Sequence, residues 1–116
     1  MATEVVLSSA DGRVVCERCL VATRPLRRMR GLLGRRLLPP GEGILLRPAA
    51  SIHTWFMRFP IDAVFLDRDD TVVAVEEHLR PWRLAARRGA RSVVELAAGE
   101  AGRRGIRVGD RLEGAR

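Results

Sequence analysis

The sequence contains no lysine, asparagine, glutamine or tyrosine. All 21 basic residues are therefore arginine, against 14 acidic residues, and the formal net charge is +7. Such a complete replacement of lysine by arginine indicates a codon bias, which weakens a functional interpretation of any single arginine. The excess of positive charge still permits an acidic partner, nucleic acid included.

Long apolar runs are absent as well. The longest are far shorter than the roughly 20 residues that a membrane-spanning helix needs, so we expect no membrane partner. The first residues, MATEVVLSSADG, carry an acid at Glu4 and no basic region before the apolar residues, unlike a secretory signal. We therefore expect a cytoplasmic location.

Cysteine is scarce, with only Cys16 and Cys19 in a CxxC spacing. No second pair completes a zinc site, and no helix start follows that would lower a thiol pKa. Residues three apart on a continuous strand point to opposite faces of a sheet. We expect two buried, unpaired cysteines. A bulge or turn at Glu17-Arg18 would change this interpretation.

The length of 116 residues and the hydrophobic content of 47% fit one domain with its own core, which we place at about residues 4–113. We find no internal repeat and no linker. Asp11-Gly12 and Asp69-Asp70 are turn signals between apolar segments, so each predicts a hairpin. We expect short strands at residues 4–7, 13–22, 43–47, 51–57, 63–67, 71–79, 92–97 and 106–112.

One stretch has helical periodicity. In residues 23–34 the apolar side chains share one arc of a helix and the arginines cover the other, with Thr23 as N-cap and Gly34 at the end. Residues 81–90 have no clean period and indicate an irregular basic loop, and residues 99–105 indicate a turn or a single helical turn. The predicted class is mainly β (α+β): a compact antiparallel β sandwich or partly closed barrel with one short amphipathic helix.

The arginines gather in two acid-free blocks, Arg24–Arg36 and Arg80–Arg91. The basic surface predicted from them comprises Arg24, Arg27, Arg28, Arg35, Arg36, Arg87 and Arg88. We favour solvated faces over a nucleic-acid footprint. A nucleic-acid binder also places exposed aromatic side chains among its arginines, and Trp82 alone fits that description.

The stretch Ser51–Asp67 concentrates the large side chains and is the candidate site. It holds His53, Trp55, Met57 and all three phenylalanines. Both faces of a strand at residues 51–57 would be largely apolar, which predicts an interior strand covered on both sides. If one face stays open, a pocket or groove results. We place its lining at His53, Trp55, Met57, Asp62 and Trp82.

Asp62 stands among apolar residues in FPIDAVF. A buried carboxylate must be paired, hydrogen-bonded to backbone N–H groups, or raised in pKa by desolvation. In the structural interpretation it caps the turn after Pro60 or pairs with an arginine such as Arg58. In the functional one it meets His53 in a concave site, where the two would act as a general base.

Five blocks in order carry a family resemblance: RGLLGR, IHTWFMRFPIDAVFLD, LRPWRL, SVVELAAG and GIRVGDRL. Over about residues 5–113 the chain resembles the domain-of-unknown-function 192 family. The middle block is the most specific. The resemblance implies a small, single-domain, mainly β protein with a short helix. It implies no reaction, because the family has no established biochemical activity.

Three functional hypotheses follow. The first is a small binding or accessory domain for a small ligand or a protein partner. The second is a hydrolytic or metal-dependent enzyme using His53 and Asp62, and the third is a basic nucleic-acid-associated protein. We find no nucleophile elbow, phosphate-cradling glycine loop or dinucleotide fingerprint. We therefore favour binding over catalysis and expect neither a metal nor a cofactor.

Overall fold

The computed structural model describes residues 3–23 and 36–114. This part of the chain is mainly β with one short helix, which confirms the predicted class. The elements in order are β1 (Thr3–Ser9), β2 (Val14–Ala22), β3 (Glu42–Leu46), β4 (Ser51–His53), β5 (Ile61–Leu66), β6 (Val72–Leu79), β7 (Leu84–Ala86), β8 (Ser92–Ala97), α2 (Glu100–Arg103) and β9 (Leu112–Glu113).

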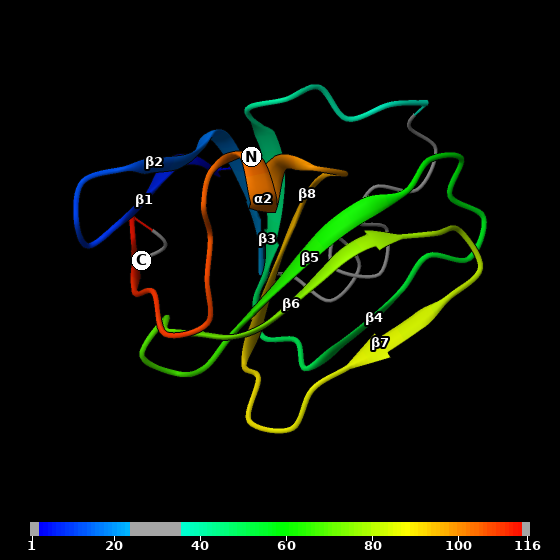
Figure 1. The fold of residues 1–116 in the computed structure, drawn as a ribbon. Coiled ribbons are helices and arrows are strands. Elements are labelled where there is room, and N and C mark those ends of the chain that lie inside the picture. Colours follow the sequence, from blue (N-terminus) through cyan, green and yellow to red (C-terminus); the bar gives the residue numbers. More distant parts are fainter. Residues whose placement is uncertain (1–2, 24–35, 115–116) are drawn as a thin grey trace.

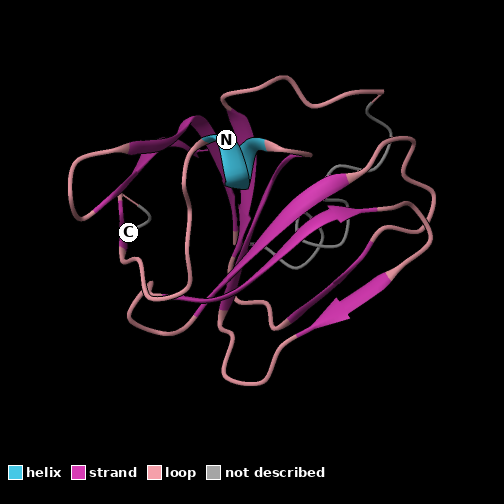
Figure 2. Cartoon of the chain, in the orientation of Figure 1, coloured by secondary structure: helices cyan, strands magenta, loops and turns pink. Residues whose placement is uncertain are grey.

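Seven strands form one curled sheet in the order β6-β5-β8-β3-β2-β1-β9 (Figure 1). A β-bridge between Thr71 and Arg111 joins the region of its first strand to that of its last, so the sheet is a partly closed barrel. Strands β4 and β7 form a separate small sheet to one side, at the lower right of Figure 2. Pairing in the large sheet is antiparallel except between β2 and β3, which are parallel. A parallel pair needs a long connection, and residues 23–41 provide it.

Strand β5 divides the core into two clusters. All six of its residues are buried, as expected for a strand covered on both faces. Val64 and Leu66 pack in a first cluster inside the curled sheet, with Ala101 of α2 and Leu112 of β9. Ile61, Ala63 and Phe65 face a second cluster, which includes Ile52 of β4 and Ala85 of β7. The second cluster therefore joins the small sheet to the large one.

Most of the predicted strands are confirmed. The β1–β2 hairpin turns at Asp11-Gly12, the β5–β6 hairpin turns at Asp69-Asp70, and β3 and β8 lie where expected. Residues 100–103 form the predicted single helical turn, α2. The helix predicted for residues 23–34 lies outside the described residues, apart from Thr23.

The strand predicted for Ser51–Met57 is wrong beyond His53. Strand β4 ends there, and Trp55 and Phe56 form a turn in which Phe56 has a φ of 66°. The prediction of an interior strand covered on both sides is also wrong. Strand β4 pairs with β7 alone, and Ser51 and His53 are exposed on either side of buried Ile52. The successive large apolar side chains of Trp55 and Phe56 therefore belong to a turn, and not to a strand that is buried on both faces.

Two further predictions need correction. Residues 84–86, expected in an irregular loop, form β7, in which Ala85 stands opposite Ile52 of β4. Three residues are too few to show a period in the sequence. The last strand, expected at residues 106–112, is only Leu112–Glu113. Gly109, with a φ of 97°, lies in a turn that precedes it.

The prediction that Cys16 and Cys19 point to opposite faces is wrong, because β2 has a bulge between them. Val5 of β1 stands opposite Cys19 and Leu7 opposite Cys16, so β2 carries one extra residue in this interval. Glu17 and Arg18 are both exposed, while both cysteines are fully buried in the first cluster. They are unpaired, as expected. A hydrogen bond between the two thiols lowers the pKa of Cys16 and raises that of Cys19.

Candidate functional site

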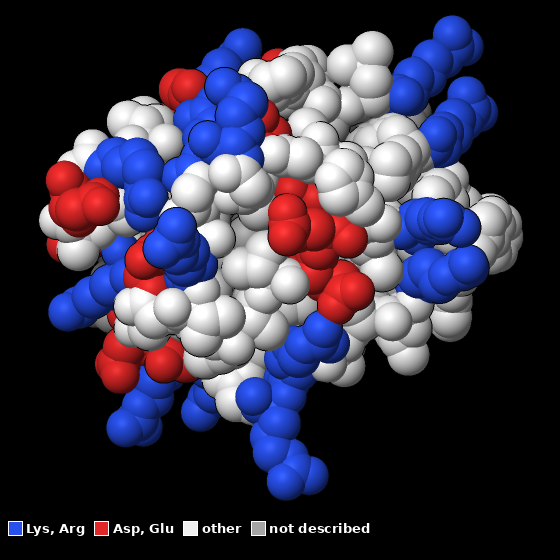
Figure 3. Space-filling view, viewed as in Figure 1, with Lys and Arg blue, Asp and Glu red and all other residues white. Residues whose placement is uncertain are grey.

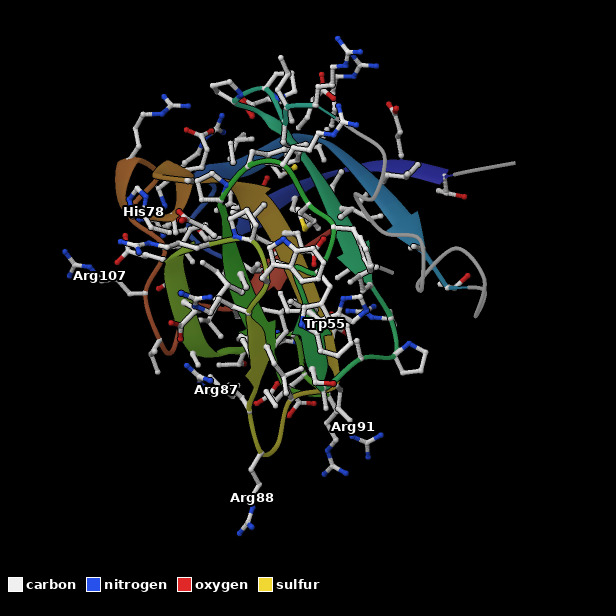
Figure 4. The ribbon with its side chains drawn as sticks, turned by 90° about the vertical axis from the view of Figure 1, so that its right-hand side faces the viewer. Trp55, His78, Arg87, Arg88, Arg91 and Arg107 are labelled. Carbon is white, nitrogen blue, oxygen red and sulfur yellow. The ribbon has the colours of Figure 1, made fainter. Side chains whose placement is uncertain are left out.

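Two neighbouring turns at the right-hand side of Figure 1 carry a group of exposed apolar side chains. One turn follows β4 and the other joins β6 to β7. The exposed fractions are 44% for Trp55, 71% for Phe56, 56% for Trp82 and 66% for Leu84. Together with exposed His53 we call these residues the aromatic end. In Figure 4 it faces the viewer, with Trp55 near the centre.

The rings of the aromatic end are arranged in two pairs. The rings of His53 and Trp55 are stacked, with centroids 4.6 Å apart and planes at 24°. The rings of Phe56 and Trp82 are tilted at 59°, with centroids 4.7 Å apart. The second pair joins the two turns, and the first joins the end of β4 to the turn that follows it.

Hydrogen bonds of the buried residue Thr54 join the two turns. It is fully buried, and its hydroxyl donates to the carbonyl of Arg80 at 2.5 Å while it accepts from the N–H of Arg83 at 2.9 Å. Its own N–H donates to the carbonyl of Arg83 at 2.8 Å, and its carbonyl accepts from the N–H of Trp82 at 3.0 Å. The aromatic end therefore rests on a fixed backbone.

The backbone at two of these aromatic residues is strained. Phe56 has a φ of 66° and Trp82 a φ of 65°. Positive φ is uncommon for a residue with a side chain and costs about 1 kcal/mol or more where it occurs. Such strain persists only where the surroundings enforce it, and it clusters at functional sites. Here the Thr54 carbonyl accepts from the N–H of Trp82 at 3.0 Å and from the N–H of Met57, next to Phe56, at 3.2 Å, so it is bonded at both strained positions.

The charge around the aromatic end has one sign. Residues 48–61 and 80–91 contain six arginines and no acid. Arg58, Arg80, Arg83, Arg88 and Arg91 have no ion pair among the described contacts, and only Arg87 is paired, with Glu76 of β6. On the face in Figure 3, arginines at the right-hand edge have no acid among them, while the left half mixes both signs.

Arginines nearer α2 and the β1–β2 hairpin behave differently. Arg13 pairs with Asp110 at 3.1 Å, and Arg104 pairs with Glu17 at 2.6 Å and with Glu100 at 3.2 Å. Arg103 pairs with Glu100 at 2.6 Å. Much of the positive charge there is therefore neutralised locally. Among the described residues, the arginines without an ion pair include five in residues 48–61 and 80–91, the two segments that carry the aromatic end.

The predicted basic surface lies partly outside the described residues, which exclude Arg24, Arg27, Arg28 and Arg35. Arg36 and Arg88 are exposed. Arg87 is half-buried, and its guanidinium lies 5.3 Å from the ring centroid of Phe65. Figure 4 places Arg87, Arg88 and Arg91 below Trp55, on the same side of the molecule as the aromatic end.

The structure separates the predicted pocket residues into three places. His53, Trp55 and Trp82 lie together at the aromatic end. Met57 is 7% exposed and packs in the second cluster. Asp62 lies on β5 and is fully buried.

Asp62 is held by backbone N–H groups, one of the states considered for it. Its carboxylate accepts from the N–H of His78 at 2.9 Å, of Gly99 at 3.0 Å and of Ala101 at 2.9 Å. The last two lie at the N-terminus of α2. Asp62 therefore ties β5 to β6 and to α2, and its oxygens are already occupied.

The enzymatic hypothesis requires His53 close to Asp62, and no hydrogen bond joins them among the described residues. The ring contact of His53 is with Trp55. Over residues 3–23 and 36–114, no group of three or more His, Cys, Asp or Glu side chains is placed to hold a metal ion. No helix in the same part of the chain is long and apolar enough to cross a membrane.

Sequence reasoning missed another buried carboxyl, Glu95 of β8. Its side chain is only 3% exposed. Glu95 stands opposite Ala63 of β5 and Ile44 of β3, and residues that stand opposite each other point to the same face of a sheet. The carboxyl therefore faces the second cluster, to which Ala63 and Ile44 belong. Burial raises the pKa of its carboxyl to about 8. The signal was available, since SVVELA sets an acid among apolar residues as FPIDAVF does.

Sequence reasoning also missed Thr54, Phe56 and Leu84 as site residues. On the strand predicted for residues 51–57, Phe56 and Trp55 would point to opposite faces, whereas both lie in the turn between β4 and β5. Nothing in the sequence marks Thr54, whose hydroxyl bonds to a turn about 26–29 residues away in the chain.

The fold is shared with proteins of known structure. A crystal structure of a "putative transcription regulator" from Sinorhizobium meliloti has a TM-score of 0.85 and 31% identity, covering 99% of this chain and 95% of that one. A protein of unknown function from Novosphingobium aromaticivorans has a TM-score of 0.83 and 25% identity, covering 97% and 84%.

Sequence comparison gives relatives among archaea. A UPF0127 protein of Pyrococcus abyssi is 37% identical over 69% of this chain and 74% of its own length. One of Thermococcus sibiricus is 30% identical over 94% of this chain and 73% of its own length. The family model DUF192, described as "Uncharacterized ACR", matches residues 6–114. The chain therefore belongs to the DUF192 family, as its sequence blocks indicated.

Proposed function

We propose that the protein is a binding module whose contact surface is the aromatic end, and that its partner is a polymer with a phosphodiester backbone. The observation that carries the proposal is the coincidence of exposed aromatic rings with unpaired arginines. Trp55, Phe56 and Trp82 stand among Arg58, Arg80 and Arg83, with no acid on either turn.

Exposed apolar area alone would fit many partners. Contiguous apolar patches that stay exposed on a folded protein mark interaction sites. The surrounding charge narrows the choice, because five arginines without ion pairs favour an anionic partner and would repel a basic one. The guanidinium group suits phosphate, to which it offers several N–H donors in a fixed plane.

Two further features support binding over catalysis. The Asp62 carboxylate is occupied by three N–H donors, so it is not free to accept a proton from a substrate. The "putative transcription regulator" of similar structure is also in keeping with a nucleic-acid partner.

The test uses a phosphodiester oligomer without bases. A fluorescein-labelled abasic deoxyribose-phosphate oligomer of about a dozen units spans the usual range of single-strand site sizes. We compare the wild type with Arg58→Ala/Arg80→Ala/Arg83→Ala by fluorescence anisotropy over a range of salt concentrations. The matched control is Arg68→Ala/Arg107→Ala/Arg111→Ala, three exposed arginines outside the aromatic end.

Both triple variants lose the same formal charge, so a general effect of net charge would weaken both equally. We expect the first to bind more weakly, with the slope of log affinity against log salt reduced by about 2, since each phosphate contact on a single strand contributes about 0.7. The control should lose little of either. Equal losses in the two variants, or no binding by the wild type at low salt, would rule the proposal out.

A further inference from the structure

We propose that the phosphodiester polymer is single-stranded nucleic acid, and that its bases stack on the rings of Trp55, Phe56 and Trp82. This inference rests on the proposed function and goes beyond it, because charge alone requires no aromatic rings. The three rings are exposed, although the chain contains only five aromatic residues of the Phe and Trp types.

The exposed rings are unusual in such a chain. Phe and Trp are the largest apolar side chains available for a core, and a domain of this size has few of them to place. Here Phe65 is fully buried and Phe59 partly buried, while the other three stand at one end of the molecule. Leaving them in water forgoes their burial, so their position needs a reason other than stability.

The ring geometry matches that of a stacking platform. His53 and Trp55 already form a stack with planes 24° apart, and a base added to the outer face of Trp55 would extend it. The Phe56–Trp82 pair provides a second place for a base on the neighbouring turn. Successive bases stacked on aromatic side chains, with the backbone held by basic residues, are the usual arrangement in proteins that bind single strands.

The fixed backbone beneath the rings supports the same conclusion. Thr54 bonds to the backbone of both turns, so the backbone that carries the rings is held in place before any partner binds. Pre-organisation lowers the conformational entropy that binding would otherwise cost. It also explains why the strained φ angles of Phe56 and Trp82 are maintained.

A single strand fits these features better than a duplex. In a duplex the faces of the bases are stacked on one another, and only their edges are open to a protein. Exposed flat rings have nothing to stack on there, whereas every base of a single strand offers a free face. The inference therefore predicts a preference for single strands and little dependence on sequence.

The protein provides its own reporter for the test. Trp55 and Trp82 are the only tryptophans, both lie at the aromatic end, and the chain has no tyrosine. Intrinsic fluorescence therefore reports on this surface alone. We titrate the wild type with a single-stranded oligothymidylate of about a dozen nucleotides, with the abasic oligomer of equal length and with a duplex of that length.

Stacking should quench the tryptophan fluorescence with the oligothymidylate and not with the abasic oligomer. We expect the oligothymidylate to bind at least about ten-fold more tightly than the abasic oligomer, given the usual contribution of a stacked base. Phe56→Ala removes one of the three rings, so it should weaken binding of the oligothymidylate more than binding of the abasic oligomer and thereby reduce this difference. Val108→Ala, which shortens an exposed apolar side chain elsewhere, should have no effect.

Each other outcome is decisive. Equal affinity for the oligothymidylate and the abasic oligomer would overturn the inference and leave the proposed function standing. Binding to neither would overturn both. A blue shift of the emission on adding phosphatidylglycerol vesicles, without binding to either oligomer, would identify the aromatic end as a membrane-contact surface and overturn both. A preference for the duplex would overturn the stacking arrangement.

Discussion

Thr54 is the residue on which the aromatic end depends. Its buried hydroxyl both donates and accepts, and the groups that it serves belong to the turn between β6 and β7. A valine has the same shape without the hydroxyl, so it would leave a carbonyl and an N–H unsatisfied in the interior. Replacing the Thr54 hydroxyl by a methyl group would therefore break the hydrogen bonds that join the turn after β4 to the turn between β6 and β7.

Thr54→Val should lower the free energy of unfolding by about 1–3 kcal/mol, the usual cost of leaving a buried polar group unpaired. It should also change the tryptophan emission of the folded protein, because Trp82 lies on the released turn. Urea denaturation followed by fluorescence measures both. Thr54→Ser keeps the hydroxyl and serves as the control. A Thr54→Val protein as stable as Thr54→Ser would show that the hydroxyl bonds contribute nothing.

Glu95 differs from Asp62 although both are buried carboxyls on adjacent strands. Asp62 has three N–H donors, whereas Glu95 has no hydrogen-bond partner among the described residues. Desolvation without compensation favours the neutral form of a carboxyl. Burial accordingly raises the pKa of the Glu95 carboxyl from the ordinary value of 4.5 to about 8.

This shift predicts how stability changes with pH. Below about pH 4.5 the Glu95 carboxyl is protonated in both the folded and the unfolded chain, and its contribution to stability is greatest. Between 4.5 and 8 only the folded chain keeps the proton, so stability should fall as pH rises, by up to about 1.4 kcal/mol per pH unit. Above that range the loss is complete.

Urea denaturation between about pH 5.5 and 8 tests this dependence. The fall in stability should be present in the wild type and in Glu77→Gln, an exposed glutamate changed as a control, and much reduced in Glu95→Gln. The comparison isolates Glu95 from other titrating groups, because only this carboxyl differs. Parallel pH profiles for the wild type and Glu95→Gln would contradict the assignment.

At the scale of elements, α2 depends on a strand for its position. The helix is only four residues long, and its N-cap residue, Gly99, has no side chain to cap it. Asp62 of β5 takes that role by accepting from Gly99 and Ala101. A carboxylate at a helix N-terminus satisfies free N–H groups and opposes the positive end of the backbone dipoles.

Asp62→Ala should therefore lower the free energy of unfolding by about 3 kcal/mol or more, because three N–H groups lose a charged acceptor inside the protein. Hydrogen exchange at the amides of Gly99 and Ala101 should accelerate more than exchange in β3. Asp69→Ala, at an exposed position in the β5–β6 turn, is the control and should be nearly neutral. Unchanged stability in Asp62→Ala would mean that water replaces the carboxylate.

The elements also show where sequence patterns suffice. Strand β8 was predicted at residues 92–97, and its six residues form a strand at those bounds. A continuous apolar run bounded by turn residues predicts a central strand well. For residues 51–57 the same pattern gave a wrong prediction. Large apolar residues continue past His53, where the strand ends, into the turn at Trp55 and Phe56. The bulge in β2 likewise leaves no mark except the adjacent polar residues Glu17 and Arg18.

At the scale of the whole molecule, the charge of the described residues is distributed unevenly. Ion pairs neutralise Arg13, Arg103 and Arg104, while Arg58, Arg80 and Arg83 have no ion pair among the described contacts. The potential at the aromatic end should therefore be positive beyond what the net charge alone would give. Exposed tryptophans in such a place should meet anions more often than cations.

Collisional quenching measures this asymmetry without any partner. We expect iodide to quench the fluorescence of Trp55 and Trp82 more efficiently than caesium does, and the difference to shrink as salt screens the charges. Arg58→Ala/Arg80→Ala/Arg83→Ala should bring the two quenching constants closer together. Arg68→Ala/Arg107→Ala/Arg111→Ala should leave them nearly as in the wild type. Equal quenching by the two ions in the wild type would contradict a positive surface.

The sequence by itself determined the mainly β class, most strand positions, the family, and the concentration of aromatic residues near His53 and Trp55. These follow from local composition and alternation, which the chain displays wherever it folds. Tertiary structure alone decided which rings are exposed, that Thr54 joins two turns, and that Asp62 supports α2 and not His53. Those features depend on contacts between residues far apart in the chain, and no local pattern records them.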